Sequence, residues 1–284
     1  MTNCSGMGTM TQAMLEYRNI KPLIGAEVLT SREALLTGAY APQIRELLEQ
    51  RGVLVFPQVH FTDEEQMAFT GTMGKIGHER TGEELTTISL DPAKSSAVEY
   101  LKGSIYWHLD GTMQDMPIYA SLLSAKVMPP EGGCTEFANT YAAYDALSDE
   151  EKQKLEGLTV MHSAWNSLLY YDPEPSSAKL EMFMNSGEAQ LPLVWTHKSG
   201  RKSLVLGCTA RHVVGMDYRE SAKLLNRLRE FATSEPFHYA HNWAVGDLVM
   251  WDNTGTLHRA VPYDPSSVRE LHRTKLDGEE AIAA

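Results

Sequence analysis

The chain has 284 residues, a net charge of -12, 43% hydrophobic residues and three cysteines. This is enough apolar material for one substantial core, and the acidic balance argues against a nucleic-acid partner, because phosphate binding needs a basic face. Cys4, Cys134 and Cys208 are widely spaced and form no CxxC pair, so neither a disulfide framework nor a zinc ribbon is indicated. A reducing, cytoplasmic location fits best.

The two ends of the chain set the expected domain organisation. Residues 1–16 are expected to form a flexible tail, and residues 17–284 a single domain. Residues 1–10 have neither a basic start nor an apolar run, which argues against a signal peptide. No stretch approaches about 20 apolar residues, so no contact with a membrane is expected.

Helix and strand patterns alternate through the N-terminal half. Apolar residues at helical spacing predict a helix over 41–51. Thr62, followed by three acidic residues, predicts the start of a second helix that ends near Gly74. The other elements expected here are strands, at 17–28 (with a turn), 53–56 and 118–127. Residues 86–90 have a strand-like pattern, but Gly82, Pro92 and the Ser95-Ser96 pair favour a loop there.

The C-terminal half shows more short strands and one unusual segment. Residues 140–156 are expected to be mostly helical, with a capping signature at Ser148. Prolines, paired serines and a glycine between residues 166 and 190 indicate a long insertion, a candidate lid. Short strands are expected at 193–196, 203–207 and 248–251, and a helix at 219–231. Many short strands with a few outer helices favour a mainly β fold with flanking helices, a double-stranded β-helix of the jelly-roll, cupin-like type.

The candidate metal ligands lie in Trp107-His108-Leu109-Asp110 and in Leu257-His258. Residues two apart on a strand point to the same side, so His108 and Asp110 can bind one ion while His258 approaches from another strand. Two imidazoles and one carboxylate, with other positions open, form the ligand set of non-haem Fe(II) oxygenases. A His-x-Asp/Glu triplet alone arises roughly once by chance in such a chain, and a surface strand with a polar pair would explain it equally well.

Arg269 and Arg273 follow His258 and are four residues apart, which places them on one face of either a strand or a helix. A guanidinium group grips a carboxylate or sulfonate through two parallel hydrogen bonds. Two anions could therefore be held beside one metal ion.

In order and spacing these motifs resemble those of the Fe(II)- and 2-oxoglutarate-dependent dioxygenases of the taurine dioxygenase and 2,4-dichlorophenoxyacetate dioxygenase type. The resemblance covers nearly the whole chain. Beyond the metal and arginine motifs, it rests on segments 24–28, 52–57, 62–74, 132–139, 142–147 and 246–253. The chain departs from many relatives at Thr254, where they carry arginine, and at Lys198, where they usually carry proline.

The resemblance implies a set of cofactors and ligands. His108, Asp110 and His258 would hold Fe(II), and the enzyme would use 2-oxoglutarate and O2 and form succinate and CO2. Thr135 and Arg269 would bind the far carboxylate of 2-oxoglutarate. Arg273 would bind either the substrate anion or the chelating carboxylate of 2-oxoglutarate.

The implied substrate is a small organic anion that is hydroxylated and, where the target carbon bears oxygen, nitrogen or sulfur, thereby cleaved. Candidate substrate contacts are Arg273, Tyr106 beside the metal motif, and His78, which lies one residue away from the spacing typical of the family's substrate-contacting histidine. Ile105 and Tyr106 replace more polar residues of taurine enzymes and favour an aryl or alkyl carboxylate or sulfonate. Relatives often form dimers or tetramers, so a homo-oligomer is a candidate assembly.

Two other function classes stay open from the sequence. In one, the barrel binds a metal or ligand without turnover and serves as a sensor. In the other, the ion is zinc and the reaction is hydrolytic, with a metal-activated water. Paired arginines beside the metal have no evident task in a hydrolase.

Overall fold

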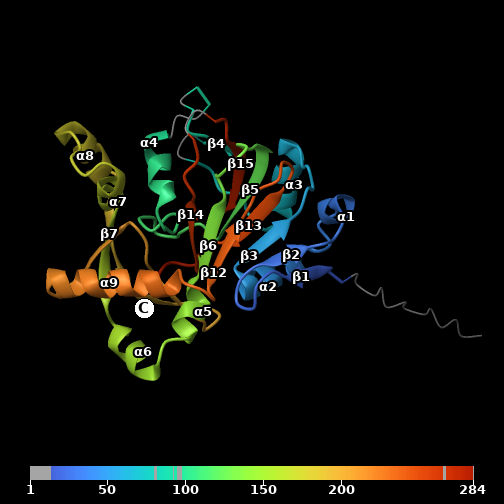
Figure 1. Ribbon diagram of the computed structural model, residues 1–284. Helices are drawn as coiled ribbons and strands as arrows, with labels where there is room; N and C mark the ends of the chain where they lie inside the picture. The colour runs from blue at the N-terminus through green and yellow to red at the C-terminus, as the bar shows by residue number, and fades with distance from the viewer. Residues whose placement is uncertain (1–13, 80–81, 92, 95–97, 265–266, 284) are drawn as a thin grey trace, which may run out of the picture.

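A computed structural model describes residues 14–79, 82–91, 93–94, 98–264 and 267–283 (Figure 1). Of the predicted tail, residues 1–13 lie outside this range. Leu15 is buried, and its backbone N–H donates to Gln43 of a helix.

The described elements run in chain order as follows: β1 (Tyr17–Asn19), β2 (Ala26–Val28), α1 (Arg32–Leu36), α2 (Ala41–Arg51), β3 (Val53–Phe56), α3 (Asp63–Met73), β4 (Thr86–Ile88), α4 (Val98–Leu101), the 3-10 helix η1 (Lys102–Ile105), β5 (Ala120–Val127), β6 (Thr135–Asn139), α5 (Thr140–Asp145), α6 (Asp149–Leu155), β7 (Thr159–Ser163), α7 (Ala164–Tyr171), α8 (Ser177–Met184), β8 (Glu188–Pro192), β9 (Val194–Thr196), β10 (Lys202–Leu204), β11 (Ala210–Val213), α9 (Tyr218–Ala232), β12 (His238–His241), β13 (Leu248–Asp252), β14 (Thr256–Ala260) and β15 (Glu270–Leu276).

Two sheets carry the centre of the fold. The larger has seven strands in the order β1-β2-β3-β13-β5-β15-β4, and the smaller has the order β12-β6-β14. Side chains from both meet in one apolar cluster that includes Val249 and Trp251 of β13 and Phe137 of β6, so the two sheets lie face to face. The mainly β fold with flanking helices is confirmed. Within the described residues each sheet is open, and none closes on itself as a barrel.

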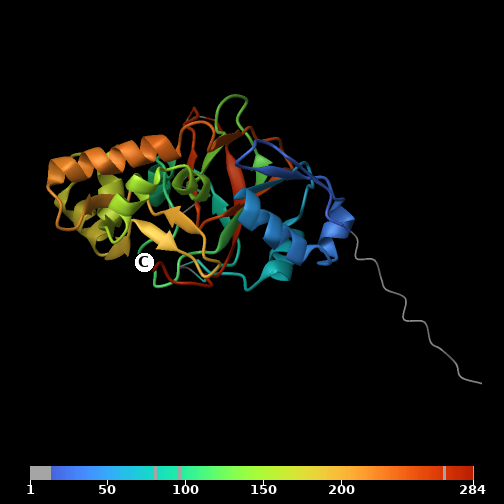
Figure 2. The same ribbon diagram turned by 90° about the horizontal axis from the view of Figure 1, so that it is seen from below.

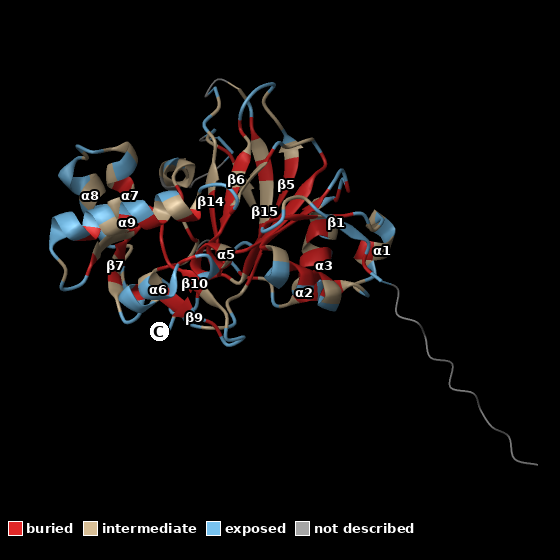
Figure 3. Ribbon diagram, turned by 60° about the horizontal axis from the view of Figure 1, so that its bottom comes forward, coloured by how far each residue is buried: buried red, intermediate tan, exposed pale blue. Residues whose placement is uncertain are grey.

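Helices cover the outer faces of this pair of sheets. On one side, α1, α2 and α3 pack on the seven-stranded sheet through an apolar cluster that includes Leu48, Phe69 and Leu122. On the other side, α5, α9 and the short sheets β10-β9 and β11-β7-β8 form a second core, and the two groups stand at opposite ends of the molecule (Figures 1 and 2). Strands between them are largely buried, whereas the outward sides of α6, α8 and α9 are exposed (Figure 3).

Local sequence signals account for the helices that were predicted. The helix expected over 41–51 is α2, and Gly52 ends it with a φ of 71°, a conformation that favours glycine. Thr62 caps α3 by accepting from the backbone N–H of Glu65, whose carboxylate accepts from the N–H of Thr62 in return. These predictions are confirmed.

Four short strands were missed, at β7, β8, β11 and β12. Their sequences, such as His238-Tyr239-Ala240-His241, lack a clear apolar alternation because both strand faces are only partly buried. Pairing with partners distant in sequence holds them instead; β12 pairs with β6. The candidate lid at 166–190 contains most of α7, all of α8 and the start of β8.

No helix in the described part of the chain combines the length and the apolar character needed to cross a membrane.

One buried histidine makes stability depend on pH. His162 on β7 is fully buried, its Nδ1 lies 2.9 Å from Thr209 Oγ1, and burial lowers its pKa to about 4. The unfolded chain takes up this proton near pH 6.5, so the contribution is complete above that pH and is lost as the pH falls towards 4. We expect a loss of about 3 kcal/mol in the free energy of unfolding over this window.

Urea unfolding at a series of pH values checks this. His162→Gln should flatten the slope between pH 4 and 6.5, whereas His60→Gln, at an exposed histidine before α3, should retain it. An unchanged slope in His162→Gln would contradict the assignment.

Candidate functional site

Three predicted metal ligands come together between the two sheets. One ligand atom from each of His108, Asp110 and His258 lies within 4.8 Å of the others. The Nε2 atom of His108 is 3.8 Å from Asp110 Oδ1, and the Nε2 atom of His258 is 3.7 Å from Asp110 Oδ2. Both imidazoles thus present the same nitrogen towards one carboxylate, with only small parts of the three side chains exposed.

The backbone around His108 differs from the expected strand. His108 forms an isolated bridge with His258, in which each backbone N–H donates to the carbonyl of the other at 3.1 and 3.0 Å. Asp110 lies in the turn that follows, ahead of Gly111 with a φ of 79°. The two side chains therefore converge because of a bridge and a turn, and the prediction of a continuous strand there was wrong.

A glycine allows this segment to lie close against its neighbour. At Gly207, with a φ of 122°, an added Cβ would meet the Trp107 carbonyl oxygen at 2.9 Å and the His108 Cα at 3.0 Å. The Cys208 backbone N–H donates to the same carbonyl. The loop after β10 thus packs directly against the backbone of Trp107 and His108.

The protonation states suit a cation. The Nδ1 atom of His108 lies 2.8 Å from the Tyr106 carbonyl oxygen, which can only accept, so Nδ1 donates there and Nε2 is the nitrogen turned towards Asp110. Burial, together with the nearby His108 ring, lowers the pKa of His258 to about 3. Burial alone would raise the pKa of Asp110, but the surrounding His258, Arg273 and His108 side chains bring it to about 2. The Nε2 atoms of two imidazoles thus face one carboxylate, a donor set that fits Fe(II).

Asn253 fixes the backbone of Asp110. Its Oδ1 accepts from the Asp110 backbone N–H at 3.0 Å, and its Nδ2 donates to the carbonyls of Asp110 and Ile118. Asn253 belongs to the turn that joins β13 of the larger sheet to β14 of the smaller one. This turn therefore also clamps the segment that carries a ligand.

Arg269 and Thr135 form a second, neighbouring group. The Arg269 guanidinium is buried, and its Nε donates to the Gly133 carbonyl while Nη2 lies 3.4 Å from Thr135 Oγ1. No carboxylate pairs with Arg269 in the described residues. Burial lowers the pKa of Arg269 to about 10, so it stays charged at neutral pH. A buried cation without an anion is costly, so an anionic group bound beside Arg269 would offset that cost.

Trp243 completes this group, and the sequence analysis missed it. The indole Nε1 donates to Thr135 Oγ1 at 3.0 Å. With both lone pairs of that oxygen engaged, by Trp243 and by Arg269, the hydroxyl proton of Thr135 is left to donate outward. The alternation of β6 and β14 places Thr135, Phe137 and His258 on one sheet face, which turns this donor towards the interior.

Arg273 lies between two carboxylates. Its Nη1 donates to Asp110 Oδ2 at 3.3 Å and its Nη2 to Glu79 Oε1 at 2.7 Å. Arg273 shares a face of β15 with Leu271 of the interior cluster, whereas Arg269 precedes this strand and a register shift lies between Glu270 and Leu271. His272 points the other way, and its Nδ1 lies 2.8 Å from Asp63 Oδ1 of α3.

The two remaining predicted substrate residues lie further out. Tyr106 donates its hydroxyl to the Tyr170 carbonyl at 2.9 Å, and the two rings meet edge to face. His78 is exposed, and its Nε2 lies 3.5 Å from Glu84 Oε1. Among the described residues, the structure gives His78 no contact with the three candidate ligands.

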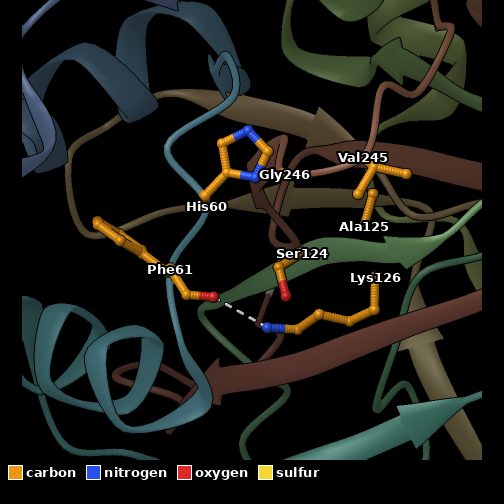
Figure 4. Close-up of a pocket in the computed structure, with 7 residues that line it drawn as sticks. All are labelled: His60, Phe61, Ser124, Ala125, Lys126, Val245 and Gly246. Carbon is orange, nitrogen blue, oxygen red and sulfur yellow. Dashed lines mark hydrogen bonds between the residues drawn. The ribbon is translucent and has the colours of Figure 1, made fainter.

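A surface hollow of about 160 Å³ is not part of this group (Figure 4). It is lined by His60, Phe61, Ser124, Ala125, Lys126, Val245 and Gly246, none of which is a predicted site residue. Ser124 donates its hydroxyl to Gln66 of α3, so this part of the hollow lies on the outer, helix-covered side of β5.

The functional neighbours that the sequence did not reveal are Trp243, Glu79 and Lys275. The signal available for Lys275 was its position two residues after Arg273, which puts it on the same strand face. Glu79 directly follows the candidate residue His78, and Trp243 lies three residues before segment 246–253, but no spacing in the sequence linked them to Arg273 or Thr135.

Comparisons with known proteins agree with this geometry. Residues 16–275 match the family described as "Taurine catabolism dioxygenase TauD, TfdA family". The chain is 38% identical to the alpha-ketoglutarate-dependent 2,4-dichlorophenoxyacetate dioxygenase of Cupriavidus pinatubonensis, over 89% of this chain and 94% of that protein. It is 34% identical to the (S)-phenoxypropionate/alpha-ketoglutarate-dioxygenase of Sphingobium herbicidovorans, over 81% and 83% of the two chains.

A solved structure is similar as well. The crystal structure of AAD-2 in complex with Mn(II) and N-oxalylglycine superposes with a TM-score of 0.81 at 35% identity, covering 95% of this chain and all of that one.

The clamp on Asp110 gives a testable prediction. Asn253→Ala removes three hydrogen bonds that hold the ligand-bearing turn, so we expect metal affinity to fall about 10- to 100-fold. Titration of metal-free protein with Mn(II), followed by paramagnetic resonance of the free ion, measures this. Asn185→Ala, at an exposed helix end, is the control, and thermal melts verify folding. Wild-type affinity in a folded Asn253→Ala protein would contradict the role.

Proposed function

The chain belongs to the taurine catabolism dioxygenase TauD/TfdA family, and from this premise we propose that its substrate is a small aryl- or alkyl-carboxylate or sulfonate. It is a 2-oxoglutarate-dependent dioxygenase that uses Fe(II), 2-oxoglutarate and O2. The observation that carries the substrate proposal is the placement of Arg273, a partly accessible guanidinium 3.3 Å from the candidate ligand Asp110. An anion bound there would lie beside the metal position.

His108, Asp110 and His258 would hold Fe(II) through two neutral imidazoles and one carboxylate. Bound there, Fe(II) supplies the reduction of dioxygen coupled to decarboxylation of 2-oxoglutarate, so that one oxygen atom enters succinate and the other becomes a hydroxyl group on the substrate. The protein's own contribution is to position the reactants and to exclude water.

Arg269 and Thr135 would bind the far carboxylate of 2-oxoglutarate. The support is that Arg269 is a buried cation with no carboxylate partner among the described residues, next to a hydroxyl whose proton is free to donate. The guanidinium keeps several N–H donors after its bond to Gly133, enough for a forked contact with a carboxylate.

The two facing sheets would form the two halves of a double-stranded β-helix. In support, the seven-stranded sheet and the β12-β6-β14 sheet share one interior cluster, and the candidate ligands lie at its edge. The turn 253–255 and the bridge between His108 and His258 tie the larger sheet, the smaller sheet and the ligand segment together.

Residues 166–190 would act as a lid over the substrate entrance. α7 and α8 have their own small apolar cluster, which includes Leu168 and Phe183, and so are separable from the main cores. A hollow of about 130 Å³ lies between α7 and α9 and leaves that interface incompletely filled. Polar contacts join the lid to the segment before His108, including the bond from Tyr106 to Tyr170 and an ion pair between Lys179 and Glu99.

The cofactor assignment is tested first without substrate. Fe(II) and 2-oxoglutarate are added anaerobically to metal-free protein, and a visible charge-transfer absorption band should appear that His108→Ala abolishes. Absence of the band in folded wild-type protein would overturn the site assignment.

The affinity for 2-oxoglutarate should show whether the two-pronged hydrogen-bonding geometry of Arg269 matters in addition to its positive charge. Arg269→Lys keeps the charge but loses the forked geometry, so we expect about tenfold weaker binding or more, because each charge-assisted hydrogen bond contributes about 1.5 to 3 kcal/mol. Trp243→Phe removes only the donor that orients Thr135 and should weaken binding about two- to tenfold. The same absorption band, titrated with 2-oxoglutarate, gives both values.

The control for Trp243→Phe is Trp195→Phe, at a buried indole whose N–H has no partner among the described residues. Equal 2-oxoglutarate affinity in wild-type, Arg269→Lys and Trp243→Phe proteins would contradict the proposed role of this group.

The hydrogen bond from Tyr106 to Tyr170 of the proposed lid should affect the binding of the organic acid but not that of 2-oxoglutarate. Tyr106→Phe removes one neutral hydrogen bond to the lid, so we expect KM for the organic acid to rise up to about tenfold while 2-oxoglutarate affinity stays unchanged. Steady-state assays of succinate formation check this, with Tyr218→Phe on the exposed side of α9 as the control. A change of equal size in the affinity for both ligands would show that Tyr106 supports the whole site.

A further inference from the structure

The carboxylate of Glu79 already binds Arg273, the arginine to which the substrate anion would bind. Glu79 Oε1 accepts from Arg273 Nη2 at 2.7 Å, a shorter contact than the 3.3 Å bond from Arg273 Nη1 to Asp110. Both partners are largely shielded, with side-chain exposures of 20% for Arg273 and 22% for Glu79. A second carboxylate can therefore reach this edge of Arg273 only in place of Glu79.

Glu79 has a second cation available. The Nζ of Lys275 lies 3.0 Å from Glu79 Oε2, the other oxygen of the same carboxylate. Lys275 is buried, and it lies two residues after Arg273 on β15, so both cations extend from one strand face. Glu79 can thus leave Arg273 without becoming a buried, unpaired charge, which would otherwise oppose its release.

Arg273 also keeps a free donor for a new anion. Its Nε is buried and has no hydrogen-bond partner in the described part of the chain. Nε and one Nη form the side edge of a guanidinium, which binds two carboxylate or sulfonate oxygens in parallel. Glu79 uses only one of these two positions, so a substrate anion with two free oxygens can make one more bond there than Glu79 makes.

We propose that Glu79 is a placeholder for the anionic group of the substrate: it occupies Arg273 in the free protein and retains only Lys275 when the substrate binds. This inference rests on the proposed function, because it takes Arg273 as the substrate's anion site. It makes Glu79 a residue that determines specificity. A fully charged, two-oxygen anion displaces Glu79, whereas a neutral ester or amide of the same acid gains too little from Arg273 to do so.

A purely structural role for Glu79 would change the affinity for the anion in the opposite direction. If Glu79 only braced Arg273 in position, its removal would weaken anion binding. If it competes for Arg273, its removal strengthens anion binding, and removal of Lys275 weakens it because Glu79 then depends on Arg273 alone.

The test measures the dissociation constant of phenoxyacetate for the anaerobic Fe(II)–2-oxoglutarate complex, from the change that binding causes in the visible absorption band. We expect Glu79→Gln to bind phenoxyacetate at least fivefold more tightly than wild type, and Lys275→Gln at least threefold more weakly. The double variant should resemble Glu79→Gln, since Lys275 acts through Glu79. Glu46→Gln, an exposed carboxylate on α2, should match wild type.

Phenoxyacetamide serves as the neutral probe. Its weaker affinity should be unchanged in Glu79→Gln, because it does not compete with a carboxylate for Arg273. Unchanged or weaker phenoxyacetate binding in Glu79→Gln would overturn the proposal. An equal gain in affinity for phenoxyacetate and phenoxyacetamide would also overturn it. The same holds if the absorption band forms normally but none of these proteins binds phenoxyacetate. Failure of the band itself in wild-type protein would instead overturn the proposed function.

Discussion

The paired backbone hydrogen bonds between His108 and His258 are the constraint on which the site depends. They join two segments that lie 150 residues apart in the chain, and they do so at the residues whose imidazoles must converge. The bridge sets the backbone separation of the two histidines, and the turn at Asp110, clamped by Asn253, brings the carboxylate between them. The position of one ligand is therefore coupled to that of the others through main-chain geometry, which is more rigid than side-chain packing.

Around this bridge the protein distributes its charges unevenly. Arg269 is buried without a carboxylate partner among the described residues, whereas Arg273 contacts two carboxylates, Asp110 and Glu79. The unpaired state of Arg269 suits an anion that is used in every reaction cycle, because that anion can bind without displacing another carboxylate. The paired state of Arg273 suits an anion that must be selected, because binding requires an internal competitor to leave. The two arginines lie four residues apart on the chain, and they differ in that only Arg273 is already in contact with carboxylates among the described residues.

Much of this could be predicted from the sequence, for identifiable reasons. Helices α2 and α3 carry strong local signals, namely apolar spacing, a capping box and a terminal glycine, and these act within a few residues. The inward direction of Arg273 follows from alternation along β15, whereas Arg269 precedes that strand and is separated from it by a register shift. The metal set could be proposed because His108, Asp110 and His258 are chemically distinctive and resemble a known family in order and spacing.

What could not be predicted depends on contacts between distant segments. His108 and Asp110 do not share a strand, and only the bridge and the Asn253 clamp, both made with residues more than 140 positions away, bring them together. Trp243 beside Thr135, and Glu79 beside Arg273, are likewise tertiary contacts without a local pattern. Strands such as β12 exist because of their pairing, so their own residues gave little indication of them.

The most direct measurement of the central claim is the stoichiometry of aerobic turnover. Oxygen uptake, succinate formation and loss of the organic acid are followed together, with Fe(II), 2-oxoglutarate and a panel of aryl- and alkyl-carboxylates and sulfonates. The account predicts that one acid in the panel stimulates all three in equal amounts, and that Arg273→Gln uncouples succinate formation from loss of the acid. Consumption of the acid without oxygen or 2-oxoglutarate, or succinate formation that no acid in the panel stimulates, would contradict it.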